Sequence, residues 1–166
     1  MALWRSGRLW VVRVQTSHPD PRRWESAGFV LVHRIPEALS TGEPEAWEMG
    51  TYLLPAWRGT GVNASVKWLA ARWVFARTGA HALLFTVADR NLRANRALAA
   101  LGWPLRELTP GPSEHPRGRM PRPPAGPYAR YLRWRVWSEG EPMRMYALWR
   151  ADAGRLPKPR REPNGP

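Results

Sequence analysis

The sequence predicts one α/β domain with a mixed, mostly antiparallel sheet and two main helices. Three observations support this fold class. The chain has 166 residues, 43% of them hydrophobic, which is enough for one substantial core. Up to residue 54, β-rich runs alternate with turns, and helical patterns then alternate with a further apolar run. No internal repeat divides the chain, so we expect residues 1–154 to form one domain, followed by a disordered basic tail at 155–166.

Three strands are expected in the first part of the chain. Residues 9–15, 27–35 and 46–54 are rich in β-branched, aromatic and other apolar residues, and Pro55 ends the third run. The segments between these runs contain Pro, Gly, Ser and Thr, which favour turns. Short connections of this kind suit neighbouring antiparallel strands.

The hydrophobic period changes from two to that of a helix after Pro55. Apolar side chains then recur at helical spacing, at Val66, Leu69, Ala70, Trp73 and Val74. Gly79 stands at a suitable C-terminal stop for this helix. Lys67 is interpreted as part of its solvated face.

A strand and a second helix follow. The apolar run at 81–87 predicts an interior strand. Asn91 suits the N-cap of a helix over 92–101, which ends at Gly102. Residues 104–127 form an insertion rich in Pro and Arg. Residues 129–137 and 143–149 alternate with period two around Glu-Gly-Glu-Pro and predict a β-hairpin.

The composition excludes several classes of function. The chain has no cysteine, so disulfides, thiolate metal sites and cysteine nucleophiles are excluded. The four histidines are far apart in the sequence and lack metal-ligand spacing, so no metal is expected. No apolar stretch approaches the ~18 residues of a membrane span, and none resembles a signal-peptide core. We therefore expect a soluble, cytoplasmic protein without membrane contact.

The net charge of +13 is concentrated late in the chain. Six arginines and no acidic residue lie between Arg117 and Arg135, and the tail adds further positive charge. Such a patch attracts nucleic acid or another polyanion, and its interleaved aromatic residues suit base stacking. No RNA-binding motif is present, however, and strand alternation or a biased genome composition explains the same residues equally well.

The pattern with the clearest chemistry is a strand, then Arg58-Gly59-Thr60-Gly61-Val62-Asn63, then a helix. Glycines let the main chain approach a ligand closely. The first turn of a helix presents unpaired N–H groups and the positive end of the helix dipole, which together bind phosphate. Arg58 can add a charged contact. The spacing fits neither a Walker P-loop nor a Rossmann fingerprint.

These residues resemble a known family. Residues 47–63, W-E-M-G-T-Y-L-L-P-A-W-R-G-T-G-V-N, resemble the strand and acetyl-CoA loop of the GNAT N-acetyltransferase superfamily, whose loop pattern is Q/R-x-x-G-x-G/A. Residues 88–103, A-D-R-N-L-R-A-N-R-A-L-A-A-L-G-W, are similar to its second block, in which Asn opens a helix ending in Leu-Gly-aromatic. The resemblance is greatest to the branch of ribosomal-protein N-terminal acetyltransferases, and it covers about a third of the chain.

The resemblance implies an acyl-CoA-dependent N-acyltransferase with acetyl-CoA as cosubstrate and no metal. A primary amine of a protein N-terminus, a lysine or a small molecule would attack the thioester directly. The main-chain N–H groups of the loop would bind the diphosphate, and the pantetheine arm would pair with the edge of strand 46–54. The cofactor-binding residues so implied are Leu53, Leu54, Arg58, Gly59, Thr60, Gly61, Val62, Asn63, Asn91, Asn95 and Arg96.

Three groups are candidates for catalysis. The backbone N–H of Leu53 would stabilise the thioester oxyanion. Glu48 lies on the same side of its strand as Gly50 and Tyr52 and could act as general base, or it could be an ordinary strand glutamate facing solvent or an arginine. Tyr128, or alternatively Tyr131, could protonate the thiolate leaving group, with packing as the other interpretation of each.

One departure from the family leaves a second function open. Members usually begin with a strand and two helices that wall the acceptor site, and the first 14 residues here cannot supply those helices. The acceptor groove is then either open or completed by a protein partner or a second copy of the chain. The alternative function is a GNAT-fold structural or interaction subunit of a larger assembly with weak or no catalysis, whose interface would be the Trp-rich hairpin at 131–149.

Overall fold

A six-stranded sheet organises the molecule. The computed structural model describes residues 7–15, 23–109 and 126–159. The strands are β1 (Gly7–Gln15), β2 (Trp24–Arg34), β3 (Ala46–Leu53), β4 (Ala82–Ala88), β5 (Arg106–Glu107) and β6 (Met143–Trp149). They lie in the order β1-β2-β3-β4-β6-β5, and only the β3–β4 pair is parallel. The predicted mixed, mostly antiparallel sheet is therefore confirmed.

Three helices pack on this sheet: α1 (Val62–Arg77), α2 (Leu92–Ala99) and α3 (Ala129–Glu139). The first two confirm the predicted helices. The third is a correction, because residues 129–137 were expected to form a strand and no Trp-rich hairpin exists at 131–149. The period-two pattern concealed a helical one: Tyr128, Tyr131 and Leu132 are buried at i, i+3 and i+4. Gly140, with φ of 69°, ends the helix.

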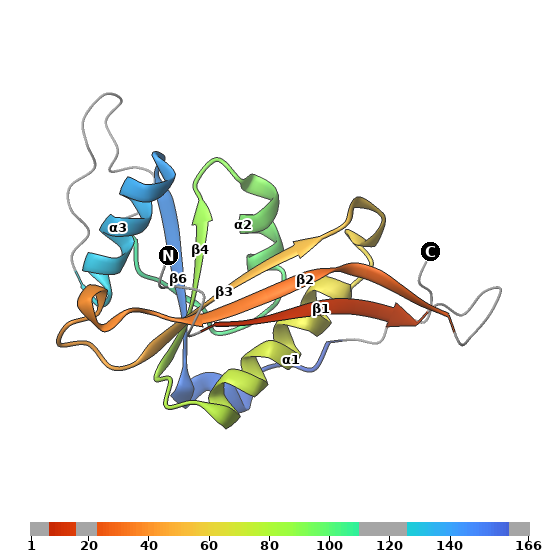
Figure 1. Cartoon of the computed structure of the whole chain (residues 1–166), viewed down its shortest axis with the longest axis horizontal. Coiled ribbons are helices and arrows are strands. Elements are labelled where there is room, and N and C mark those ends of the chain that lie inside the picture. Colours follow the sequence, from red (N-terminus) through yellow and green to blue (C-terminus); the bar gives the residue numbers. More distant parts are fainter. Residues whose placement is uncertain (1–6, 16–22, 110–125, 160–166) are drawn as a thin grey trace.

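The helices form layers on both faces of the sheet. α1 and α2 pack on one face and α3 on the other (Figure 1). Side chains of β3 alternate between the two layers, so Trp47 and Met49 belong to the core under α1 and Ala46 belongs to the core under α3. Within the described residues, no helix is long and apolar enough to cross a membrane.

The buried stripe of α1 differs from the predicted one. Its buried residues are Lys67, Ala70, Ala71, Val74 and Phe75. Leu69, which was expected to face the core, is 61% exposed, and Lys67, which was expected to face solvent, is 6% exposed. The prediction placed only apolar residues in the buried stripe and therefore left Lys67 out. The predicted buried face was for this reason rotated about the helix axis relative to the observed one.

The feature that positions the site is the short contact between β3 and β4. Residues 46–48 pair with residues 82–84, and the pairing stops there. Beyond this point the two strands diverge, and Figure 1 shows β4 turning away from β3 toward α2. The last five residues of β3 thus bond to β2 on one edge and leave the other edge without a partner strand.

Part of the sheet face opposite α1 carries exposed apolar side chains. Leu9 and Val11 of β1, Phe29 of β2 and Tyr52 of β3 are all exposed, and the last two rings stack with centroids 5.4 Å apart. Strand register places Val11 opposite Phe29 and Phe29 opposite Tyr52, so these residues form one continuous surface. No described helix covers it.

Candidate functional site

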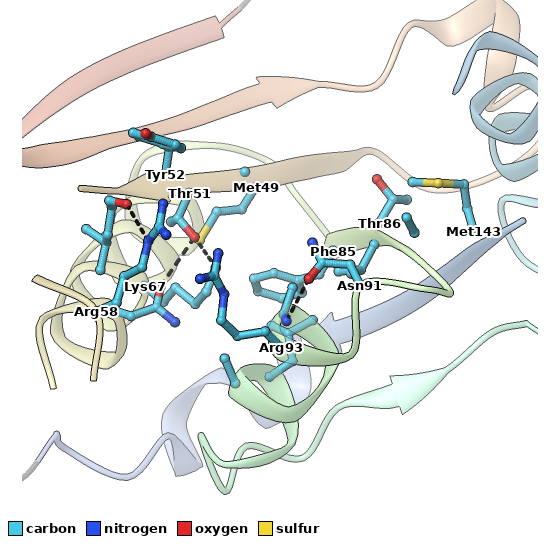
Figure 2. Close-up of a pocket in the computed structure, with 18 of the residues that line it drawn as sticks. Met49, Thr51, Tyr52, Arg58, Lys67, Phe85, Thr86, Asn91, Arg93 and Met143 are labelled. Carbon is cyan, nitrogen blue, oxygen red and sulfur yellow. Dashed lines mark hydrogen bonds between the residues drawn. The ribbon is translucent and has the colours of Figure 1, made fainter. Parts of the chain in front are cut away.

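An open cavity of about 490 Å³ lies between the diverging ends of β3 and β4. One wall is the free half of β3 with the loop before α1, and the other is the end of β4 with the first turns of α2 (Figure 2). Met49, Thr51 and Leu53 line the first wall and Phe85, Thr86 and Val87 the second. The cleft lies where the sequence predicted an acyl-CoA site.

The loop before α1 presents free main-chain donors at this cavity. Gly59 and Gly61 have φ of 83° and 77°, a conformation that glycine adopts without steric cost. The backbone N–H groups of residues 59–63 donate to no acceptor among the described residues. A Cβ added to Gly59 would meet no atom within 4 Å, so no side chain blocks the space over Gly59. The Thr60 hydroxyl bonds locally to the Trp57 carbonyl, 2.9 Å away.

The free edge of β3 adds donors beside the loop. Leu54 donates its backbone N–H to the Ala27 carbonyl of the sheet, 2.8 Å away, so its amide is not available to a ligand. Since N–H groups alternate in direction along a strand, the N–H of Leu53 points the other way, into the cleft. The Leu53 carbonyl accepts from Arg58 Nε at 3.0 Å, which holds Arg58 along the cavity wall.

Of the α2 residues that the sequence predicted, only Asn91 lines the cavity. Its side chain caps the helix by accepting from the Ala94 N–H at 3.1 Å, which confirms the predicted N-cap. Arg96 is exposed and does not line the cavity. Arg93, which the sequence analysis did not select, does line it. Helical spacing from Asn91 could not have selected Arg93, because residues two apart on a helix lie on different faces.

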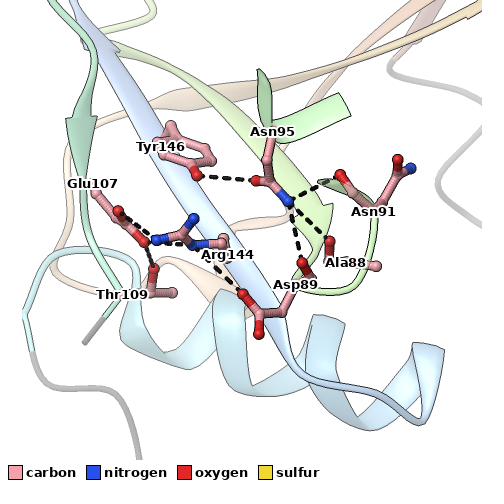
Figure 3. Close-up of polar contacts among 8 residues, drawn as sticks. All are labelled: Ala88, Asp89, Asn91, Asn95, Glu107, Thr109, Arg144 and Tyr146. Atoms are coloured by element: carbon pink, nitrogen blue, oxygen red, sulfur yellow. Dashed lines mark hydrogen bonds and ion pairs between the residues drawn. The ribbon is translucent and has the colours of Figure 1, made fainter. Parts of the chain in front are cut away.

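Asn95 has a structural position instead (Figure 3). Its Nδ2 donates to the carbonyls of Ala88, Asp89 and Asn91 at 3.2, 3.4 and 3.0 Å, and its Oδ1 accepts from Tyr146 at 2.9 Å. The amide nitrogen thus holds the turn between β4 and α2, and the amide oxygen ties it to β6. Asn95 contacts the backbone of Asn91, and it does not line the cavity itself.

Glu48 is a buried carboxylate at the point where β3 and β4 separate. It is 5% exposed and accepts hydrogen bonds from the hydroxyls of Thr86 and Tyr131. His33 Nε2 lies 3.4 Å and Arg135 Nε 3.6 Å from its two oxygens. Burial alone would raise the pKa of Glu48, but these four partners outweigh burial and hold the pKa below its ordinary value. Glu48 is therefore not the solvent-facing glutamate of the alternative interpretation, but it does face an arginine, as that interpretation also allowed.

The tyrosine beside Glu48 is Tyr131 rather than Tyr128. Tyr128 is buried among α3 residues and donates to the Pro44 carbonyl at 3.1 Å, away from the cavity lining. Burial and the charge of Glu43 raise its pKa to about 12. Burial and the Glu48 carboxylate raise the pKa of Tyr131 far above its ordinary value, so its hydroxyl stays protonated. The structure thus does not bring Tyr128 to the predicted site.

The charges in the cavity are unbalanced. The two acidic residues that line it are already paired, Glu139 with Arg135 at 2.8 Å and Glu141 with Arg90 at 2.6 Å. Arg58, Lys67 and Arg93 also line it, and none of them forms an ion pair with any described carboxylate. The cavity therefore holds a surplus of positive charge, which suits an anionic ligand.

Two other predictions concern ligands elsewhere. The first three arginines of the patch from Arg117 to Arg135 lie outside the described residues, and its last member, Arg135, is paired with Glu48 and Glu139. In the described ranges, no cluster of three or more His, Asp or Glu side chains is arranged to hold a metal ion.

Comparison with known proteins agrees with the fold. Residues 2–103 match the family described as "Acetyltransferase (GNAT) domain". The solved spermidine N-acetyltransferase of Vibrio cholerae, in complex with CoA and spermine, superposes with a TM-score of 0.53 at 14% identity, over 89% of this chain and 68% of that chain. A chimera containing the same enzyme gives a TM-score of 0.54 at 15% identity, over 90% and 69%. At such identities the similarity shows the fold alone. No protein of curated function matches the chain.

Proposed function

The chain belongs to the GNAT acetyltransferase domain family, and from that premise we propose that it transfers an acetyl group from acetyl-CoA to a primary amine. The observation that carries the proposal is the set of free N–H groups at residues 59–63, in the loop whose Gly59 and Asn63 line the cleft between β3 and β4. Backbone donors at a helix N-terminus bind diphosphate groups. The unpaired cations Arg58, Lys67 and Arg93 add the charge that such a ligand requires.

The residues present fit acetyl-CoA along the whole cleft. The loop at 59–63 would hold the diphosphate, and the free edge of β3 would pair with the pantetheine amides. The thioester supplies an activated acyl group that an amine can attack directly. The N–H of Leu53 would then stabilise negative charge on the carbonyl oxygen, an effect worth about 2.7–4 kcal/mol for a well-placed donor.

Glu48 acts, in this proposal, by positioning its neighbours. Its lowered pKa makes it a weak base for an ammonium, and the cavity lining does not include it. Two of its partners, Thr86 and Arg135, do line the cavity. Glu48 therefore fixes these two groups at the end of the cleft where the strands separate.

The acceptor is proposed to be an amine on an apolar or polypeptide carrier. The Vibrio cholerae neighbours are named for spermidine, a polycation. This chain carries a net charge of +13, and the acidic side chains that line its cavity are paired with arginines, so the cavity is poorly suited to a polycation. The exposed surface of Leu9, Val11, Phe29 and Tyr52 offers apolar contact on the sheet face opposite α1. Resemblance to the ribosomal-protein branch supports a protein N-terminus among the acceptors.

Calorimetry with acetyl-CoA tests the proposal, and two glycine variants sharpen it. Gly59→Ala places a methyl group where the ligand would lie. Gly42→Ala is the matched control, because Gly42 has a similar φ of 81° and equally open surroundings outside this cavity. Both variants should lose about 1–2 kcal/mol of stability from the left-handed backbone. Only Gly59→Ala should weaken acetyl-CoA binding, by about tenfold or more.

The result also separates enzyme from scaffold. Absence of acetyl-CoA binding to the wild-type protein at millimolar concentration would remove the transferase and favour the structural subunit. Equal affinities of the two glycine variants would show that the ligand does not lie over Gly59. Acetyl transfer to a panel of peptides and polyamines, followed by mass spectrometry, then identifies the acceptor class.

A further inference from the structure

Lys67 is a buried cation without a counter-charge. Its Nζ donates to Thr51 Oγ1 at 2.7 Å and lies 5.4 Å from the centroid of the Phe85 ring. No described carboxylate pairs with it. Removing an unpaired charge from water costs several kcal/mol, and lysines beside an apolar core normally extend their ammonium to solvent. Folding alone therefore does not explain this position.

The ammonium is directed toward the first turn of α1. Long side chains on a helix lean toward its N-terminus, and the close-up shows Lys67 bonded to Thr51 at the cavity wall (Figure 2). The Thr51 hydroxyl that accepts from Lys67 donates in turn to Asn63 Oδ1, 3.3 Å away. Asn63 is the second residue of α1. Two hydrogen bonds therefore connect the ammonium to the loop whose N–H groups are free.

We propose that Lys67 is a phosphate ligand of the cleft, whose ammonium pairs with a diphosphate oxygen of acyl-CoA while Thr51 and Asn63 hold it in place beforehand. The inference rests on the proposed function, which puts acyl-CoA in this cavity. The ligand supplies the counter-charge that the protein lacks. Lys67 is thus a binding residue for the donor substrate and takes no part in the acyl transfer.

Protonation of Lys67 gives the inference a distinctive signature. Burial lowers the pKa of Lys67 to about 8 in the ligand-free protein. The other charged groups at the cavity are Arg58 from the loop, Arg93 from α2, and the pairs Arg135–Glu139 and Glu141–Arg90. None of the acids is free to replace the phosphate. Pairing with phosphate raises the pKa of the amine, so binding above pH 8 takes up a proton.

Titration calorimetry with acetyl-CoA at pH 8.5, in two buffers of different ionisation enthalpy, measures this uptake. The wild-type protein should take up about 0.7 of a proton. Lys67→Met should take up almost none and bind acetyl-CoA about 10- to 100-fold more weakly. Dephospho-acetyl-CoA, which keeps the diphosphate, should show the same loss. Arg72→Met is the matched control, since Arg72 is an exposed cation of the same helix that stacks on Trp68 outside the cavity.

Each outcome decides between the alternatives. Wild-type binding without proton uptake overturns the inference and needs no variant. Equal affinity of Lys67→Met and the wild-type protein also overturns it but leaves the transferase proposal intact. Failure of the wild-type protein to bind acetyl-CoA at all removes both. Detection of acetyl-Lys67 by mass spectrometry after incubation with acetyl-CoA would instead make Lys67 an acyl acceptor and refute its role as a phosphate ligand.

Discussion

Tyr131 of α3 donates its hydroxyl group to the Glu48 carboxylate of β3, at the last residue that β3 pairs with β4. The contact joins the helix on one face of the sheet to the point where the two central strands separate. Thr86 of β4 bonds to the other oxygen of the same carboxylate. One side chain thus connects both strands and the helix that covers them.

Replacing Glu48 by Gln should destabilise the protein by about 3 kcal/mol at pH 7, because Arg135 loses a buried counter-charge. Denaturant unfolding measures the change. The pKa of Glu48 is lower in the folded than in the unfolded state. The stability that its charge contributes is therefore complete above pH 4.5, the ordinary pKa, and is lost as the pH falls through the pKa of the folded state. The difference between variant and wild type should shrink in acid. Glu139→Gln, at the exposed partner of Arg135, should cost under about 1 kcal/mol.

Replacing Lys67 by Met should stabilise the ligand-free protein by about 1–3 kcal/mol near pH 7, since it removes a buried cation whose pKa is lowered from 10.5 to about 8. The cationic form is disfavoured in the folded state, so the penalty is complete below pH 8 and disappears as pH rises toward 10.5. Unfolding measured from pH 7 to 10 should show the two proteins converging. A constant gap across this range would contradict the lowered pKa.

Replacing Asn95 by Ala should cost about 2–4 kcal/mol, because three carbonyls of the turn after β4 and the Tyr146 hydroxyl lose their partner. Thermal unfolding gives the magnitude. Hydrogen exchange should show faster opening of α2 while α1 stays protected. Arg96→Ala, at the next position and exposed, should change stability by less than about 0.5 kcal/mol.

Two truncations on α1 test which of its faces is buried. Val74→Ala removes a fully buried side chain and should cost about 2 kcal/mol. Leu69→Ala removes a side chain that is 61% exposed and should cost under about 0.5 kcal/mol. Equal costs in chemical denaturation would instead support the stripe that the hydrophobic pattern predicted.

Elements with a single strong local signal were predictable from the sequence. The β-rich runs before Pro55 became β1, β2 and β3, and the cap at Asn91 formed as expected. The glycines Gly59 and Gly61 also marked the free amides correctly. In each case the physical determinant lies within a few residues of the element itself.

Features that depend on tertiary contact were not predictable in the same way. The sequence of α3 carries two periods at once, and burial of Tyr128, Tyr131 and Leu132 against the sheet accompanies the helical one. The burial of Lys67 depends on Thr51, which is 16 residues earlier in the chain. Hydropathy scales assign lysine to the solvent-exposed surface. Burial of Lys67 therefore becomes apparent only when the structure shows β3 packed against α1.

Because β3 and β4 pair over only three residues each, a ligand bound in the cleft would add to the contacts that join the two halves of the sheet. The β1-β2-β3 half of the sheet pairs with the β4-β6-β5 half through residues 46–48 and 82–84 alone among the described residues. Beyond these residues no described strand lies between β3 and β4. A ligand whose amides bond along the free edge of β3 would complete the missing row of the sheet. Loss of such a ligand would leave the two half-sheets joined by these three residue pairs alone, so occupancy of the cleft should increase the rigidity of the sheet.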